Sequence, residues 1–166
     1  MIYEDKIDWA DPNKTGDVLS FTQSKFKSAV LDYQIEVEGD LEDIIRRHFR
    51  DPEAYKVKLL GFQHRIELVR ALIGKTPDDG IWEIVKRLGE LRNQYSHSRF
   101  TGTAAGKKKI EDVTTKILGQ LKSVRPGIFP DGLPELEIIT QAHFMVRRFF
   151  REINEALDNL GLPRSL

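Results

Sequence analysis

Residues 81 to 97 read IWEIVKRLGELRNQYSH, and this segment shows most clearly how the chain folds. Its apolar side chains recur at the i, i+3, i+4 and i+7 spacing of an amphipathic helix, at positions Ile81, Ile84, Val85, Leu88, Leu91 and Tyr95. The preceding turn, Thr76-Pro-Asp-Asp-Gly80, supplies capping oxygens and acidic groups suited to a helix N-terminus. We therefore predict a helix here with one face committed to a hydrophobic core.

Helical spacing of apolar residues also recurs on both sides of this segment. Upstream, it predicts a long helix from about residue 20 to residue 49, and a second helix that begins near Pro52, ends at Ile73 and is capped by Gly74. Downstream, it predicts a short helix over residues 110 to 121 and a final one from about Glu135 to Asn159. Residues 98 to 109, with two glycines and three consecutive lysines, predict a mobile basic loop.

The pattern as a whole predicts an all-α fold, an up-and-down bundle of four to five helices. Neither an alternating strand pattern nor an internal repeat is present in the sequence. At 166 residues, with no long linker, the chain has the size of a single domain. We expect residues 1 to 17, which are rich in turn formers, to form an extended N-terminal arm, and residues 20 to 166 to form the bundle.

Composition excludes several classes of function. Lys plus Arg and Asp plus Glu both number 26, so no global basic field attracts nucleic acid or anionic membrane. The absence of cysteine excludes disulfides and thiolate chemistry. No apolar run has the length of a membrane span, and the polar N-terminus is unlike a signal peptide, so we expect a cytoplasmic protein. Because no phosphate loop, dinucleotide fingerprint or metal-ligand spacing is present, we expect neither a cofactor nor a metal.

The candidate catalytic residues lie at the end of the predicted 81–97 helix. His97 can exchange a proton near neutral pH, and Arg92 can hold phosphoryl oxygens by a bidentate contact. With the 2′-hydroxyl of RNA as nucleophile, such a pair is sufficient for phosphodiester cleavage without a metal. Asn93 is placed to orient either group. Candidate substrate-binding residues follow from proximity in the sequence, and they are Tyr95, Arg99, Lys107 and Lys108.

The geometry of a regular helix argues against a site built from one straight copy. Residues 92 and 97 lie roughly 140° apart around the axis, whereas Arg92 aligns with Ser96, and Asn93 with His97. Either the helix ends or distorts near Ser96, or two copies meet across a two-fold axis and pool their residues. The second arrangement predicts a homodimer that concentrates basic charge in one groove.

Each candidate also has a structural explanation. Arg92 and His97 suit the last turns of a helix, where cations interact favourably with the helix dipole. Tyr95 lies on the apolar stripe, which favours a role in the core. His48 and His64 lack metal-ligand spacing and are expected at the surface or the edge of the core. His143 shares a turn with Arg147 and precedes Arg148, which indicates a second anion-binding patch as a less favoured hypothesis.

The string Leu91-Arg-Asn-Gln-Tyr-Ser-His97 resembles the signature of the HEPN superfamily, an Arg followed by a polar residue and then by a His four to six residues beyond the Arg. Residues 59 to 73, and more loosely residues 40 to 49, are similar to helices of the mannitol operon repressor family. The resemblance implies a HEPN-like helical bundle, usually dimeric, and in many members a metal-independent ribonuclease with its Arg and His in a cleft at the dimer interface.

Two functions are therefore expected. The first is a metal-independent endoribonuclease or RNA-binding protein, of toxin type when an antitoxin partner restrains it, acting through Arg92, His97 and Asn93. The second is a non-catalytic regulatory or scaffolding domain, similar to the mannitol operon repressor family of transcriptional regulators, that binds a protein partner. The HEPN superfamily contains both kinds of member, so the resemblance leaves open whether this chain is an enzyme.

Overall fold

The computed structural model describes residues 12–49, 56, 60–74, 79–96 and 103–162, with side chains described from residue 23 onward. These residues form helices and no strand. The helices are α1 (Pro12–Arg47), α2 (Phe62–Ile73), α3 (Asp79–Ser96), α4 (Ala104–Val124) and α5 (Glu135–Asn159). The predicted all-α helical bundle is confirmed.

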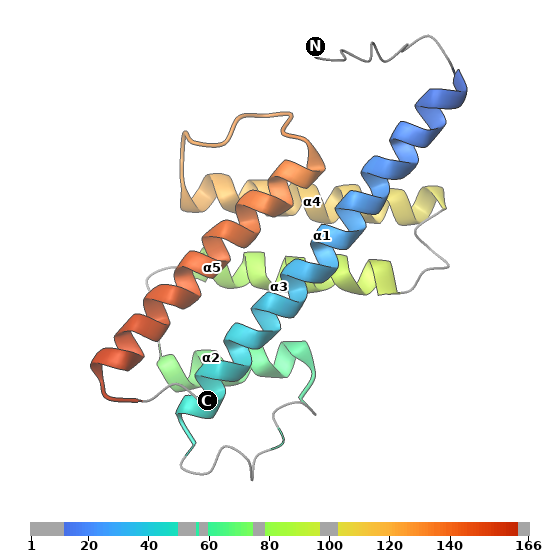
Figure 1. Ribbon diagram of the computed structural model, residues 1–166. Helices are drawn as coiled ribbons and strands as arrows, with labels where there is room; N and C mark the ends of the chain where they lie inside the picture. The colour runs from blue at the N-terminus through green and yellow to red at the C-terminus, as the bar shows by residue number, and fades with distance from the viewer. Residues whose placement is uncertain (1–11, 50–55, 57–59, 75–78, 97–102, 163–166) are drawn as a thin grey trace, which may run out of the picture.

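The helices form two crossed layers (Figure 1). One layer contains α2, α3 and α4, which lie side by side and alternate in direction as an up-and-down bundle requires. The other contains α1 and α5, which pack against each other across that layer and run in the same direction. Tyr33 contacts Thr140 and Arg47 contacts Asn154, and both pairs are separated by 107 residues, so the register is constant along the parallel pair.

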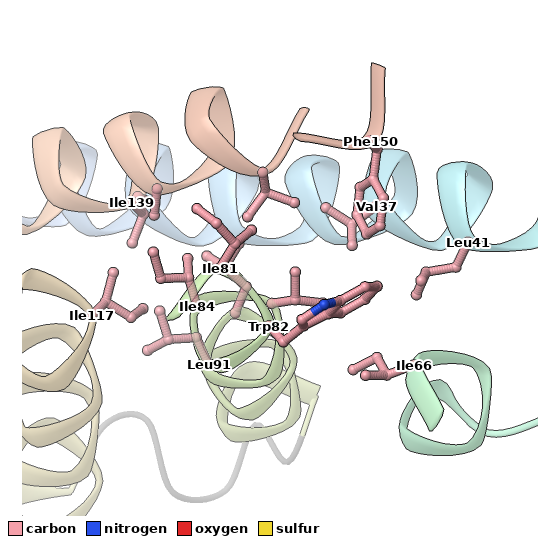
Figure 2. Close-up of a cluster of buried hydrophobic side chains, with 14 of the residues drawn as sticks. Val37, Leu41, Ile66, Ile81, Trp82, Ile84, Leu91, Ile117, Ile139 and Phe150 are labelled. Atoms are coloured by element: carbon pink, nitrogen blue, oxygen red, sulfur yellow. The ribbon is translucent and has the colours of Figure 1, made fainter. Parts of the chain in front are cut away.

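The core is centred on α3, which contacts each of the other four helices. Figure 2 shows buried side chains from all five helices converging around it. Trp82 is 1% exposed, and its ring packs edge-on against Phe149 and Phe150, with centroids 5.3 and 5.8 Å away. At Gly89 a Cβ would lie 2.4 Å from the Phe62 ring, so glycine allows α2 to approach α3 closely. The apolar stripe predicted for residues 81 to 91 is confirmed as the centre of the core.

Two predicted helix starts upstream of α3 are wrong. α1 begins at Pro12, so residues 12 to 17 are helical and not part of an extended arm, while residues 1 to 11 lie outside the described part of the chain. Proline suits this place because the first helical turn has no partner for its missing N–H. α2 begins only at Phe62, after Gly61 in an extended conformation. The Nε atom of Arg65 donates to the Leu60 carbonyl and holds the chain at this start.

The predicted basic loop is also wrong for its last residues. Lys107, Lys108 and Lys109 lie in the first turns of α4, which begins at Ala104 and extends over 21 residues. The hydroxyl of Thr103 accepts from the Gly106 N–H at 3.0 Å, so a capping residue fixes the helix start within the segment that the glycines had marked as a loop. Residues 98 to 102 lie outside the described residues.

The predicted ends of the second and the last helix, at Ile73 and Asn159, agree with the structure. Gly74 has φ 75° and donates its N–H to the Arg70 carbonyl, as a C-terminal cap does. After α5, Gly161 has φ 74° and donates to Asp158, while the N–H of Leu162 bonds the Leu157 carbonyl. These two bonds define a Schellman motif, which ends α5 where the sequence predicted.

Candidate functional site

The end of α3 presents Arg92 and Asn93 to solvent. An Nη1 of Arg92 lies 3.4 Å from the Asn93 side-chain oxygen, a long contact that orients the guanidinium loosely. The Ser96 hydroxyl donates to the Arg92 carbonyl at 3.1 Å, so positions 92 and 96 align as the helical geometry predicted. The buried Leu91 anchors the same turn in the core. A firmly packed helix therefore carries an exposed guanidinium whose contact to Asn93 is long.

Tyr95 belongs mainly to the core. Its ring is half-buried and packs against Phe26 of α1, with centroids 5.8 Å apart. Burial, with the nearby carboxylate of Glu135 adding to it, raises the pKa of Tyr95 to about 12. Burial also raises the pKa of Glu135, and the negative charge of Glu111 acts in the same direction. The surroundings of Tyr95 therefore favour a role in the hydrophobic core. The same observations place two acidic groups, Glu111 and Glu135, near this end of the bundle.

The remaining predicted site residues divide into two groups. His97 and Arg99 lie outside the described residues, so the structure gives no distance between the side chains of Arg92 and His97. Lys107 and Lys108 are exposed on α4 and line a shallow hollow. The other residues that line it are two acids, one further lysine and two uncharged residues, namely Glu111, Asp112, Lys116, Ala104 and Thr115. The lysines therefore stand among acids and do not form a purely basic surface.

A second polar cluster lies between α1 and α5 and contains His143. The imidazole stacks on the Tyr33 ring with centroids 3.9 Å apart and planes 2° from parallel. Its Nε2 lies 3.2 Å from Oε2 of Glu36. Burial lowers the pKa of His143, the Glu36 carboxylate opposes that shift, and the positive charge of Arg147 adds to it.

Asp40 and Arg147 extend this cluster along the same pair of helices. An Nη1 of Arg147 donates to Oδ2 of Asp40 at 2.7 Å, and the Arg147 Nε lies 3.5 Å from Oε2 of Glu36. Burial raises the pKa of Asp40 to about 6, even though the Arg147 charge and hydrogen bond act to lower it. A carboxyl group that exchanges its proton near neutral pH is a recognised mark of a functional site, although structural ion-pair networks produce it too.

The sequence identified only part of this cluster. It singled out His143 with Arg147 and Arg148, all on α5, and missed Tyr33, Glu36 and Asp40 on α1. The available signal was a polar stripe at i, i+3 and i+7 on α1, but such a stripe ordinarily faces solvent. Only the parallel pairing of α1 with α5 brings these residues together.

The other histidines behave as surface or edge groups. The Nδ1 of His48 lies 2.7 Å from the Ile44 carbonyl of the preceding turn, and His64 is exposed. Within the described residues, no three His, Cys, Asp or Glu side chains lie close enough together to hold a metal ion. None of the described helices has an apolar stretch of the length needed to cross a membrane.

Comparisons with protein-family models, with curated proteins and with solved structures found no match to this chain.

Proposed function

We propose that this chain is a HEPN-like domain that acts on RNA in the cytoplasm as a metal-independent endoribonuclease, or at least as an RNA-binding protein. Arg92 holds the phosphate, His97 transfers the proton and Asn93 orients the guanidinium. Two copies of the chain contribute their Arg and His residues to one cleft across a two-fold axis. A toxin restrained by an antitoxin protein is one cellular role that fits this activity.

The supporting observation is the state of Arg92. Of the arginines whose side chains are described, Arg92 and Arg125 are the two for which the structure contains no carboxylate partner. Arg92 instead has a long contact to the neutral Asn93. A guanidinium without a competing acid keeps its donors available for phosphoryl oxygens, which it contacts in bidentate geometry.

The chemistry follows from these roles. His97 as general base takes the proton of the 2′-hydroxyl, whose oxygen attacks the adjacent phosphorus, and the 5′-oxygen leaves with a proton supplied by an acid. We assign the role of that acid to His97 of the second copy, since a two-fold dimer would supply one imidazole from each chain. Arg92 stabilises the charge that grows on the phosphoryl oxygens. The products have a 2′,3′-cyclic phosphate and a 5′-hydroxyl.

The test is cleavage of transfer RNA and total RNA by purified protein in EDTA, with the product ends analysed. We expect cyclic phosphate ends from the wild type, and a loss of about a hundredfold or more in rate from either Arg92→Ala or His97→Ala. Arg125→Ala is the matched control, because it removes an equally unpaired arginine from the end of α4. Cleavage that persists in His97→Ala would refute the assigned role.

The acids near the end of α3 favour a second candidate function. Glu111, Asp112 and Glu135 lie on the helices next to this end and reduce its attraction for RNA. A surface of mixed charge suits a protein partner better, as in a regulatory or scaffolding domain similar to the mannitol operon repressor family. In that case Arg92→Ala and His97→Ala leave partner binding unchanged, and no cleavage is observed across varied RNAs.

A further inference from the structure

A hollow of about 260 Å³ opens along α5, beside its contact with α1. One lining residue comes from α1 and the other five from α5, and together they are Asp40, Phe144, Arg147, Arg148, Arg151 and Asn154. The α5 residues are spaced i, i+3, i+4, i+7 and i+10, which places them along one stripe of the helix. The hollow lies on a different pair of helices from Arg92 and Asn93 and takes no part in the function proposed above.

The lining carries an excess of positive charge. Three arginines and one carboxyl group face the hollow, in a chain whose formal net charge is zero. Arg148 and Arg151 are paired only along their own helix, with Glu152 at 2.9 Å and Glu155 at 3.9 Å, and all four side chains are more than half exposed. Exposed pairs of this kind are weak. Both guanidiniums can therefore exchange a glutamate for a stronger acceptor at low cost.

Phe144 adds an apolar surface to the same hollow. The residue is 64% exposed, which makes it one of the few large apolar residues on the described surface. It lies one turn from Arg147 and Arg148 on the same helix face. An exposed ring next to guanidinium groups provides a flat surface for stacking beside donors for an anion.

We propose that this hollow binds a phosphomonoester that carries an aromatic ring, with its phosphate on Arg148 and Arg151 and its ring against Phe144. A phosphate accepts bidentate hydrogen bonds from guanidinium groups, and a planar ligand group stacks on the phenyl ring. Two sources share this chemistry, a free nucleotide and a phosphorylated tyrosine, and the experiment below distinguishes them. The proposal rests on α5 alone and is independent of whether Arg92 and His97 cleave RNA.

Asp40 offers a substitution that should strengthen binding, whereas substitution of the arginines should weaken it. Its carboxylate lines the hollow, accepts a hydrogen bond from Arg147 and repels an incoming phosphate. The charges that act on it are Glu36 and Asp43 from α1 and Arg147 from α5. Replacing Asp40 by Asn removes the repulsion and one of the two carboxylates that pair with Arg147. The Asp40→Asn variant should therefore bind the phosphomonoester more tightly, whereas loss of an arginine weakens binding.

The experiment is a calorimetric titration of the full chain with phenyl phosphate and, separately, with inorganic phosphate. We expect saturable binding of phenyl phosphate, and a loss of about tenfold or more in affinity for the Arg148→Ala/Arg151→Ala variant. Phe144→Ala should remove the preference for phenyl phosphate over inorganic phosphate, and Asp40→Asn should raise the affinity. The matched control, Arg125→Ala, removes a cation that does not line the hollow and should bind as the wild type does.

Titrations with AMP and with O-phosphotyrosine identify the source, and tighter binding of either supports the proposal. Absence of saturable binding of phenyl phosphate would overturn it, as would equal affinities in the wild type and the double arginine variant. Phe144, Arg148 and Arg151 are exposed, and Asp40→Asn keeps the size of the partly buried Asp40 side chain, so the variants should fold, which circular dichroism checks. The chain could instead associate with itself through this surface. If Phe144→Ala abolishes that self-association and phenyl phosphate does not change it, the surface binds a second copy of the chain and the proposal is overturned.

Discussion

α5 packs against α3 through an apolar face and against α1 through a polar one. On the α3 side, Phe149 and Phe150 enclose the buried Trp82. On the α1 side, successive contacts join Tyr33 to His143, Asp40 to Arg147, and Arg47 to Asn154 and Asp158. Apolar side chains can pack in many alignments of two helices, whereas charged pairs and stacked rings form in only one alignment. The comparison teaches that the α3 contact stabilises α5 by apolar burial, and that the polar contacts to α1 fix how the two helices align.

The largest effect on stability should come from breaking the apolar contact. Trp82→Ala removes a large buried ring from the centre of the core and leaves a cavity among Phe149, Phe150 and their neighbours. We expect the free energy of unfolding to fall by about 3 to 5 kcal/mol, measured by denaturant titration. Trp82→Phe serves as the control, because it keeps an aromatic ring in place and should cost much less. A loss under about 1 kcal/mol for the alanine variant would show that the core collapses around the gap.

The next effect should come from the end of the polar contact. The Arg47 side chain is fully buried, donates to the Asn154 side chain at 3.0 Å and pairs with Asp158. Arg47→Met keeps the bulk and removes the donors, so the free energy of unfolding should fall by about 2 kcal/mol, since the half-exposed Asp158 recovers some hydration. Arg148→Met, which breaks only the exposed pair with Glu152, should change stability by less than about 0.5 kcal/mol. Equal values for the two variants would contradict the distinction.

A smaller, pH-dependent effect should come from the middle of the polar contact. Because burial raises the pKa of Asp40 from 3.8 to about 6, the folded state binds a proton that the unfolded state releases. This stabilisation is fully present below pH 4 and is lost as pH rises through 6. Asp40→Asn, which resembles the protonated form, should raise the free energy of unfolding by about 1 to 2 kcal/mol at pH 8 and have little effect at pH 4. A difference that does not depend on pH would refute the shifted pKa.

The smallest effect on stability should come from Arg92, which belongs to neither contact. Its side chain is exposed and its contact to Asn93 is long, so Arg92→Ala should change the free energy of unfolding by less than about 0.5 kcal/mol. Thermal unfolding followed by circular dichroism measures this. A loss above about 1 kcal/mol would instead support the structural explanation, in which Arg92 stabilises the end of α3.

The sequence predicted the apolar contact much better than the polar one. A helical period marks residues such as Ile84 and Leu88 directly, because a buried face has a regular spacing. The partners of His143 and Arg147 could not be predicted, since α1 is remote in sequence and its acids resemble an ordinary solvated stripe. Helix starts at Pro12 and Ala104 were missed because turn-forming residues also cap helices. The catalytic roles of Arg92 and His97 are predicted from their residue types alone. The structure describes Arg92 on α3, whereas His97 lies outside the described residues.

The constant separation of 107 residues between paired positions of α1 and α5 has a consequence for the order of folding. Contacts between α3 and α4 close a short loop, whereas the first and last helices meet only after most of the chain has been brought together, which costs more chain entropy. We expect the α3–α4 hairpin to form early and the α1–α5 contact to close last. During synthesis, the part of the α3 surface that α5 covers would then stay exposed after α1, α2 and α4 have been made, until α5 follows them.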